Sequence, residues 1–197
     1  MVGVIEDISK LTRHAFQTAG DDVVLLGRNT DELGGSEYLY VTADLVAGPP
    51  PGVDLEAERA LQHAVLAMNH AGLLRSAHDC SEGGLACALA EAALGDGERP
   101  LGVHVELDDP LRPVGILFGE AQGRIVLSCD PSTTAEVLRV AERYAVPARR
   151  LGSVTAAEQG ISITVPGANV VATLAEAADA YFGALPRAMG AVAPGEA

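Results

Sequence analysis

The sequence predicts an α+β protein in which helices pack on a mixed β-sheet. Segments with strand and helix patterns alternate along the chain, but their order is irregular. Near the C-terminus, two strand-like segments at residues 151–154 and 161–165 follow one another, and the second alternates cleanly between apolar and polar residues. Consecutive strands of this kind fit a mixed sheet better than a strictly doubly wound one.

In the first half of the chain, several patterns predict individual elements. An extended apolar piece at residues 2–5 opens the chain, and a continuous apolar run at residues 23–26 follows two aspartates. A run of this length, bounded by turn residues, is typical of a buried strand. The proline-rich loop at residues 48–52 is stiff and ends any helix before it. Residues 55–71 then carry apolar side chains at helical spacing, which predicts an amphipathic helix.

Two glycines precede a possible helix cap between these elements. Gly34 and Gly35 stand directly before Ser36, a residue type that caps helices well. Glycine-rich backbone at a helix start can cradle an anion, but the same pattern also forms a loop that binds nothing. The residues alone leave both interpretations open.

The middle of the chain predicts two further strands. Strict alternation at residues 101–107 predicts a strand with His104 on its wetter face. A turn then leads to residues 111–118, which can hold a short helix, and residues 124–128 have the pattern of a buried strand.

Two capping-box spacings predict helix starts in the last third of the chain. Thr133 and Glu136 are expected to begin one amphipathic helix, and Thr173 and Glu176 the last one. Pro186 should end or kink that last helix.

Length and charge limit the class of protein. The chain has 197 residues, of which 48% are hydrophobic, so we expect one domain over residues 1–190 and a frayed tail at 191–197. The formal net charge of −14 repels phosphate backbones, so nucleic acid is not an expected partner. No apolar stretch is long enough to cross a membrane and no secretory signal is evident, which favours the cytoplasm.

The cysteine pattern predicts free thiols. The chain has an odd number of cysteines, Cys80, Cys87 and Cys129, and no two of them have the C-x₂-C spacing of a zinc site. Cys80 lies in a polar motif, but no neighbouring residue is an obvious base for a nucleophile, and a small buried cysteine is the commoner case.

The stretch at residues 76–86 carries the chemistry predicted for this chain. A polar cluster there ends in Gly83 and Gly84 and enters a helix, whose unpaired N–H groups and dipole attract phosphate. Asp79 adds a hard oxygen ligand that suits phosphate-bound Mg²⁺, and Ser81 adds a hydroxyl. The alternative is a plain turn, in which Ser81 is only an N-cap and Asp79 caps a neighbouring loop.

A second candidate pair lies in the loop before the predicted strand at residues 124–128. Glu120 and Gln122 could reach a ligand cleft from this loop. They could equally well cap or hydrogen-bond the end of the strand, and both interpretations stay open.

Four segments resemble, in the same order, the enzyme family phosphoribosylformylglycinamidine synthase. They are residues 2–7, 33–38, 78–90 and 118–124, and the third begins His-Asp-Cys-Ser-Glu-Gly-Gly-Leu-Ala. With the order of strands and helices, the resemblance covers nearly the whole chain. Other members of the superfamily share the general layout but have different glycine turns.

The resemblance implies the fold of the C-terminal domain of the aminoimidazole ribonucleotide synthetase-like superfamily, an α+β sandwich. Enzymes of the family contain two similar halves of two domains each, and this chain resembles only the last of the four domains. The other domains would hold the catalytic histidine and most contacts to ATP and substrate. No catalytic residue is therefore assigned, and the chain alone is expected to be inactive.

The resemblance also implies roles for single residues. The family places Mg²⁺ on the aspartate matching Asp79 and a nucleotide, ATP or ADP, on the serine matching Ser81; in this half the nucleotide is auxiliary and structural. Glu120 and Gln122 match a Glu-Ser-Gln segment that holds substrate in the other half, although Ala121 stands here in place of the serine.

The whole enzyme would convert formylglycinamide ribonucleotide to formylglycinamidine ribonucleotide in purine biosynthesis, using ATP and ammonia from glutamine. Its expected partners are the other domains of the enzyme, a glutaminase and small accessory subunits. Two alternatives remain: a structural packing module with an empty site, and a stand-alone phosphate-binding or kinase-like enzyme of the superfamily.

Overall fold

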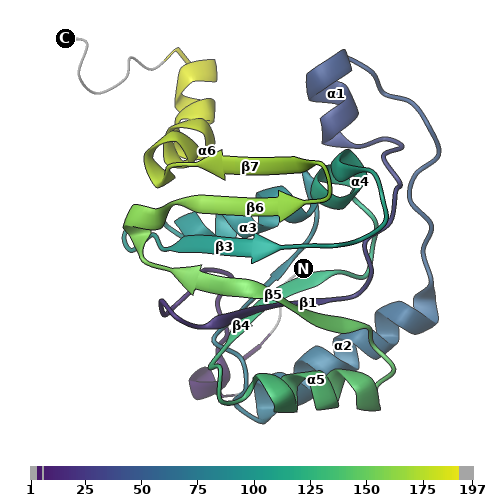
Figure 1. The fold of residues 1–197 in the computed structure, drawn as a ribbon, viewed down its shortest axis with the longest axis vertical. Helices are drawn as coiled ribbons and strands as arrows, with labels where there is room; N and C mark the ends of the chain where they lie inside the picture. The colour runs from purple at the N-terminus through teal and green to yellow at the C-terminus, as the bar shows by residue number, and fades with distance from the viewer. Residues whose placement is uncertain (1–3, 6, 191–197) are drawn as a thin grey trace.

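The computed structural model describes residues 4, 5 and 7–190 and contains one seven-stranded sheet (Figure 1). The strands are β1 (Asp22–Leu26), β2 (Ser76–Asp79), β3 (Gly102–Glu106), β4 (Ile125–Cys129), β5 (Ala148–Thr155), β6 (Ile161–Val165) and β7 (Ala168–Ala172). The helices are α1 (Glu37–Ala43), α2 (Leu55–His70), α3 (Gly84–Leu94), α4 (Pro113–Phe118), α5 (Thr134–Arg143) and α6 (Leu174–Ala188), with short 3₁₀ turns at Ile8–Lys10 and Ala157–Gln159.

The sheet is mixed, which confirms the predicted fold class. Its strands lie in the order β2-β4-β1-β5-β3-β6-β7. Strands β3 and β6 are parallel, and every other neighbouring pair is antiparallel. The two strands that follow one another in sequence, β5 and β6, are not neighbours because β3 lies between them. Strand β7, which no pattern had indicated, pairs with β6 at the edge of the sheet.

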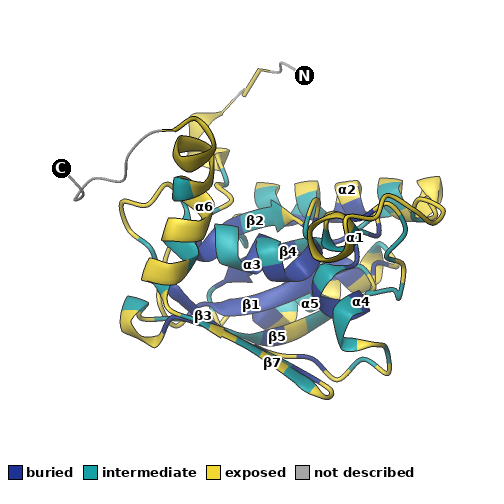
Figure 2. Cartoon of the chain, turned by 90° about the horizontal axis from the view of Figure 1, so that it is seen from above, coloured by how far each residue is buried: buried dark blue, intermediate teal, exposed yellow. Residues whose placement is uncertain are grey.

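Helices cover both faces of the sheet, which explains the unbroken apolar run of β1. Val23 and Leu25 pack in a core cluster with residues of α3 and α4, whereas Val24 and Leu26 pack in a second cluster with residues of α2 and α5. A strand buried on both faces cannot alternate with polar residues. In Figure 2, β1 is accordingly dark blue, while α6 is largely yellow.

The helix caps follow the sequence in two of three places. Ser36 caps α1 by accepting from the Leu39 N–H, and Thr173 forms the predicted capping box with Glu176 at α6. The predicted box at Thr133 is wrong, because its hydroxyl donates to the carbonyl of Asp130 at 2.9 Å instead of capping α5.

Other local predictions concern the last helix, one histidine and the cysteines. Helix α6 runs to Ala188, so Pro186 does not end it. His104 is exposed on β3, and the three cysteines are free thiols. Residues 2 and 3 of the extended piece expected at residues 2–5 and the whole tail at 191–197 lie outside the described residues. Among the helices that the structure describes, none has the length and apolar content needed to cross a membrane.

A buried carboxylate just before β1 makes stability depend on pH. The Asp21 side chain is 3% exposed, and its Oδ2 atom has no hydrogen-bond partner among the described residues. Burial raises the pKa of Asp21, and the Arg75 guanidinium 3.9 Å away opposes this shift only in part. The folded protein therefore carries an unfavourable charge at neutral pH.

We expect Asp21→Asn to increase the free energy of unfolding at neutral pH by about 1 kcal/mol. The penalty for the wild-type charge is complete above the raised pKa and absent below about pH 3.9, the ordinary pKa of aspartate, so the gain should shrink on acidification. Urea denaturation of both proteins at several pH values in this range measures the gain. Asp130→Asn is the control and should lower the free energy of unfolding at neutral pH, because hydrogen bonds from Ser132 lower the pKa of Asp130 in the folded protein. An Asp21→Asn variant no more stable than wild type at neutral pH would contradict the prediction.

Candidate functional site

The predicted motif lies where β2 turns into α3. Strand β2 pairs with β4 up to Asp79, and the Cys80 N–H then donates to the carbonyl of Arg124 at 3.0 Å. The Gly84 N–H donates to the carbonyl of Ser81 at 3.0 Å, which closes a tight turn before the helix. The N-cap of α3 is Gly83, so Ser81 is not the helix cap that the plain-turn interpretation required.

Asp79 and Ser81 are close together at this turn. The Ser81 hydroxyl donates a hydrogen bond to Oδ2 of Asp79, and this bond is the main cause that lowers the pKa of Asp79. The Asp79 side chain is 70% exposed. An ionised carboxylate that faces solvent can bind a cation without first losing a proton.

His78 connects the turn to α3, a role that sequence patterns did not indicate. Its Nδ1 atom lies 2.8 Å from the carbonyl oxygen of Asp79, and its Nε2 atom lies 3.1 Å from a carboxylate oxygen of Glu91. The imidazole is mostly buried at 14% exposure. These contacts orient the turn and leave no free ring nitrogen for a metal.

Burial keeps Cys80 protonated. Loss of solvent raises the pKa of the Cys80 thiol to about 11, so the reactive thiolate is scarce at neutral pH. This agrees with the interpretation of Cys80 as a small buried side chain.

Both glycines of the turn have left-handed backbone. Gly83 has φ +75° and Gly84 has φ +66°, a region that L side chains rarely adopt. A Cβ atom on Gly84 would lie 2.5 Å from the carbonyl oxygen of Gly119. The motif therefore needs glycine both for its backbone angles and for its close approach to the loop that carries Glu120.

Glu120 reaches the start of two helices from the loop between α4 and β4. Its Oε1 atom accepts a hydrogen bond from the Gly83 N–H at 2.8 Å and another from the Glu37 N–H at 2.9 Å. The carboxylate thus accepts a hydrogen bond from Gly83, one of the N–H groups at the start of α3 that were expected to bind phosphate. We call these two hydrogen bonds the Glu120 bridge.

A cleft of about 250 Å³ lies beside the bridge. It is lined by Gly34, Gly35, Pro50, Pro51, Cys80, Ser81, Glu82, Glu120 and Gln122. Of the predicted site residues, it brings together Ser81, Glu120 and Gln122, while Asp79 stands beside the lining through its hydrogen bond to Ser81. The proline loop was expected only as a stiff loop, and for the Gly34-Gly35 segment an anion cradle and a plain loop were both open; both segments form walls of the cleft.

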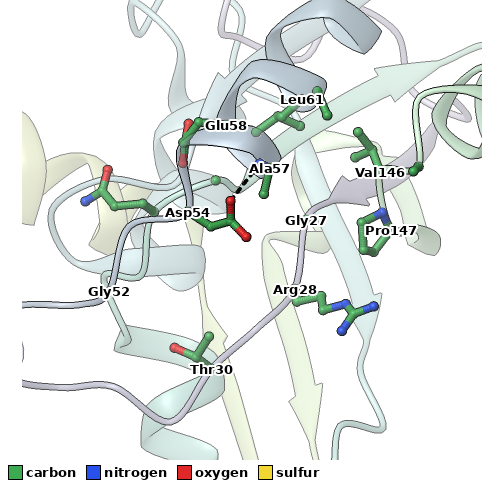
Figure 3. Close-up of a pocket in the computed structure, with 14 residues that line it drawn as sticks. Gly27, Arg28, Thr30, Gly52, Asp54, Ala57, Glu58, Leu61, Val146 and Pro147 are labelled. Carbon is green, nitrogen blue, oxygen red and sulfur yellow. Dashed lines mark hydrogen bonds between the residues drawn. The ribbon is translucent and has the colours of Figure 1, made fainter.

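A larger cavity of about 410 Å³ adjoins the cleft at Gln122, which lines both. Among its lining residues, Figure 3 shows Asp54 directly before α2, Leu61 on α2, and Val146 and Pro147 in the segment before β5. Asp54 accepts hydrogen bonds from the first N–H groups of α2, so it acts here as a helix cap.

The residues fit a metal only as a shared site. Within the described part of the chain, no group of three or more His, Cys, Asp or Glu side chains is placed to hold an ion. Mg²⁺ commonly uses one or two carboxylates together with phosphate oxygens of a substrate. Asp79 suits that arrangement, with the ligand's phosphate supplying further oxygens.

The fold and the cleft together define a class of protein: an α+β domain that presents an Asp-x-Ser-x-Gly-Gly turn at the corner between a strand and a helix. A family model described as AIR synthase related protein, C-terminal domain, matches residues 18–165. The chain belongs to this family.

Two curated relatives are similar over most of the chain, and both are named phosphoribosylformylglycinamidine synthase subunit PurL. Identity is 41% over 171 residues with the protein of Thermoanaerobacter sp. (strain X514) and 47% over 152 residues with that of Moorella thermoacetica. These regions cover 87% and 77% of this chain but only 23% and 20% of the relatives. The chain thus spans less than a quarter of their length.

A solved structure described as T. maritima PurL complexed with ATP has the same fold. It superposes with a TM-score of 0.67 and 25% sequence identity, over 87% of this chain and 28% of that chain.

Proposed function

We propose that this chain is the C-terminal domain of a phosphoribosylformylglycinamidine synthase, a ligase that uses ATP to convert formylglycinamide ribonucleotide to formylglycinamidine ribonucleotide in purine biosynthesis. The observation that carries the proposal is the similarity to two relatives of that name over most of the chain. Because the chain spans only part of those relatives, the reaction belongs to the whole protein, and we expect no turnover from the chain alone.

Within that enzyme, the proposed contribution of this chain is an auxiliary nucleotide site and packing against the other domains. Residues 1–190 act as one domain in this proposal. The remaining partners are a glutaminase and small accessory subunits, as the family resemblance implies, and the proposed location is the cytoplasm.

The proposed nucleotide site is the turn at the start of α3. Asp79 would hold Mg²⁺ through an exposed, ionised carboxylate, and Ser81, Gly83 and Gly84 would meet the phosphates of ATP or ADP. Bound Mg²⁺ would neutralise phosphate charge in this acidic protein. Glu120 and Gln122 are the proposed contacts for substrate, since both line the adjoining cleft.

One observation favours the structural packing module as the second candidate. The Gly83 N–H already donates to Glu120, and the Gly84 N–H donates to the carbonyl of Ser81. With these groups satisfied inside the protein, the turn is stable without a ligand.

Calorimetric titration with ADP and Mg²⁺ separates the two candidates. We expect saturable binding that weakens by about tenfold or more in Asp79→Ala, because a metal ligand is lost. Without Mg²⁺, wild type and Asp79→Ala should bind ADP equally weakly, since the carboxylate then has no ion to hold. Asp108→Ala, at a side chain that is 99% exposed, is the control.

Equal affinity of wild type and Asp79→Ala in the presence of Mg²⁺, or no binding by either, would favour the packing module. Steady ATP or kinase turnover by the purified chain alone would instead favour a stand-alone enzyme of the superfamily.

A further inference from the structure

The Glu120 bridge places a protein carboxylate on an N–H group at the start of α3. We propose that Glu120 competes there with the phosphate of the nucleotide, so that nucleotide binding breaks the bridge and releases α1 from α3. This inference rests on the proposed function, because it uses the nucleotide site at Asp79 and Ser81. Glu120 is then a residue that sets the affinity of the site, in addition to its proposed contact with substrate.

The position of Glu120 is imposed by a buried arginine behind it. Arg124 is 2% exposed, and its guanidinium donates to the carbonyls of Ala121 and Gly119 and to Oδ1 of Asn29. The guanidinium therefore holds a peptide group on each side of Glu120. Among the described residues it forms no ion pair with a carboxylate, so it acts on the loop backbone. The backbone on both sides of Glu120 is thus held in place.

Phosphate and Glu120 cannot use the Gly83 N–H together. Both are anions, and a backbone N–H has a single proton to donate. Ser81 and Glu120 also line the same small cleft, where a bound phosphate and a fixed carboxylate would repel each other. A nucleotide that contacts Gly83 must therefore displace the carboxylate.

Displacement has a consequence for α1, because the same Oε1 atom accepts from the Glu37 N–H at 2.9 Å. Helix α1 has seven residues and none of them is buried, and Figure 1 shows it standing out from the body next to α4. Another contact of α1 with the body is the stacking of Tyr38 on Phe118, with ring centroids 5.1 Å apart. A short helix with so few contacts depends on each one.

The displaced carboxylate becomes available to the cleft. While the bridge is formed, Oε1 of Glu120 already accepts two hydrogen bonds from helix N–H groups. Only Oε2 is then left for the proposed contact with substrate, and opening the bridge frees both oxygens. Nucleotide binding at the turn would thus prepare Glu120 for substrate.

The test compares binding of Mg·ADP to the full chain and to two variants. Glu120→Ala removes the competing carboxylate, so its affinity for Mg·ADP should rise by about tenfold or more, the value of one charge-assisted hydrogen bond. Glu120→Gln keeps an acceptor oxygen without the charge and should lie between. Glu82→Gln is the matched control: it removes a charge from the same cleft, and Glu82 forms no ion pair in the described structure. Its affinity should change by less than about threefold.

Amide hydrogen exchange, measured residue by residue, tests the release of α1. Saturating Mg·ADP should speed exchange at Glu37 in wild type, although a ligand usually slows exchange, and should slow it at Gly83. In Glu120→Ala, exchange at Glu37 should already be fast before ADP is added.

Affinity in Glu120→Ala that equals or falls below wild type would overturn the competition, and the Asp79-dependent binding of wild type would still support the proposed function. Unchanged exchange at Glu37 on binding would overturn the release of α1. If no variant binds Mg·ADP, the nucleotide site and this inference both fail, whereas the exchange at Glu37 in Glu120→Ala still reports whether the bridge exists.

Discussion

Gly84→Ala is expected to lower the free energy of unfolding by about 3 kcal/mol or more, because two penalties add at this position. The residue has φ +66°, so any side chain adds backbone strain. Its new Cβ atom would also lie 2.5 Å from the carbonyl oxygen of Gly119 and 2.9 Å from the carbonyl carbon of Phe118. Both contacts are with backbone, which cannot rotate away, so α3 and the loop carrying Glu120 must separate.

Gly72→Ala is the matched control for this prediction. Gly72 has φ +69°, almost the same as Gly84, but a Cβ atom added there would have no other atom within 4 Å. Gly72→Ala should lower the free energy of unfolding only through backbone strain, by about 1–2 kcal/mol. Chemical denaturation of both variants isolates the packing contribution as their difference. Equal losses would mean that the loop after α4 moves aside freely, and would contradict the rigid placement of Glu120.

The second large effect concerns the central strand. Leu25→Ala and Leu26→Ala should each lower the free energy of unfolding by about 2–5 kcal/mol, the range for leucines removed from a closed core. Both side chains are 0% exposed, and they lie in different core clusters on opposite faces of the sheet. Truncating two neighbouring side chains of a strand costs equal stability only if both faces of the sheet are covered.

Leu66→Ala on α2 is the control, since Leu66 is 52% exposed and should cost no more than about 0.5 kcal/mol. Urea denaturation of the three variants measures the losses. A small loss in either Leu25→Ala or Leu26→Ala would mean that one face of β1 is open, against the layered packing described above.

Periodicity in the sequence was enough to predict most elements. The apolar run at residues 23–26 predicted a buried strand, and the alternation around His104 predicted one that is half exposed, because each pattern records what covers the two faces of a strand. Periodicity did not predict β7 (Ala168–Ala172), which lies at the edge of the sheet and is only partly buried.

The capping-box spacing predicted a cap only where no other acceptor competed for the hydroxyl. Thr173 and Glu176 form their box because both partners lie within one turn of α6. Thr133 has the same spacing, but its hydroxyl donates to the carbonyl of Asp130, and the hydroxyl of its neighbour Thr134 donates to Asp22 of β1. The four-residue spacing shows neither the competing carbonyl three residues earlier nor the contact of Thr134 with a residue 112 positions away.

By itself, the sequence determined the fold class, the buried strands and the turn with Asp79, Ser81 and the two glycines, because these depend on side-chain patterns within a few neighbours. Only the tertiary structure decided that Glu120 would occupy the Gly83 N–H and join α1 to α3. The reason is physical: a helix start offers free N–H groups wherever it forms, but which anion reaches them depends on the order of the strands, which brings the loop before β4 beside β2.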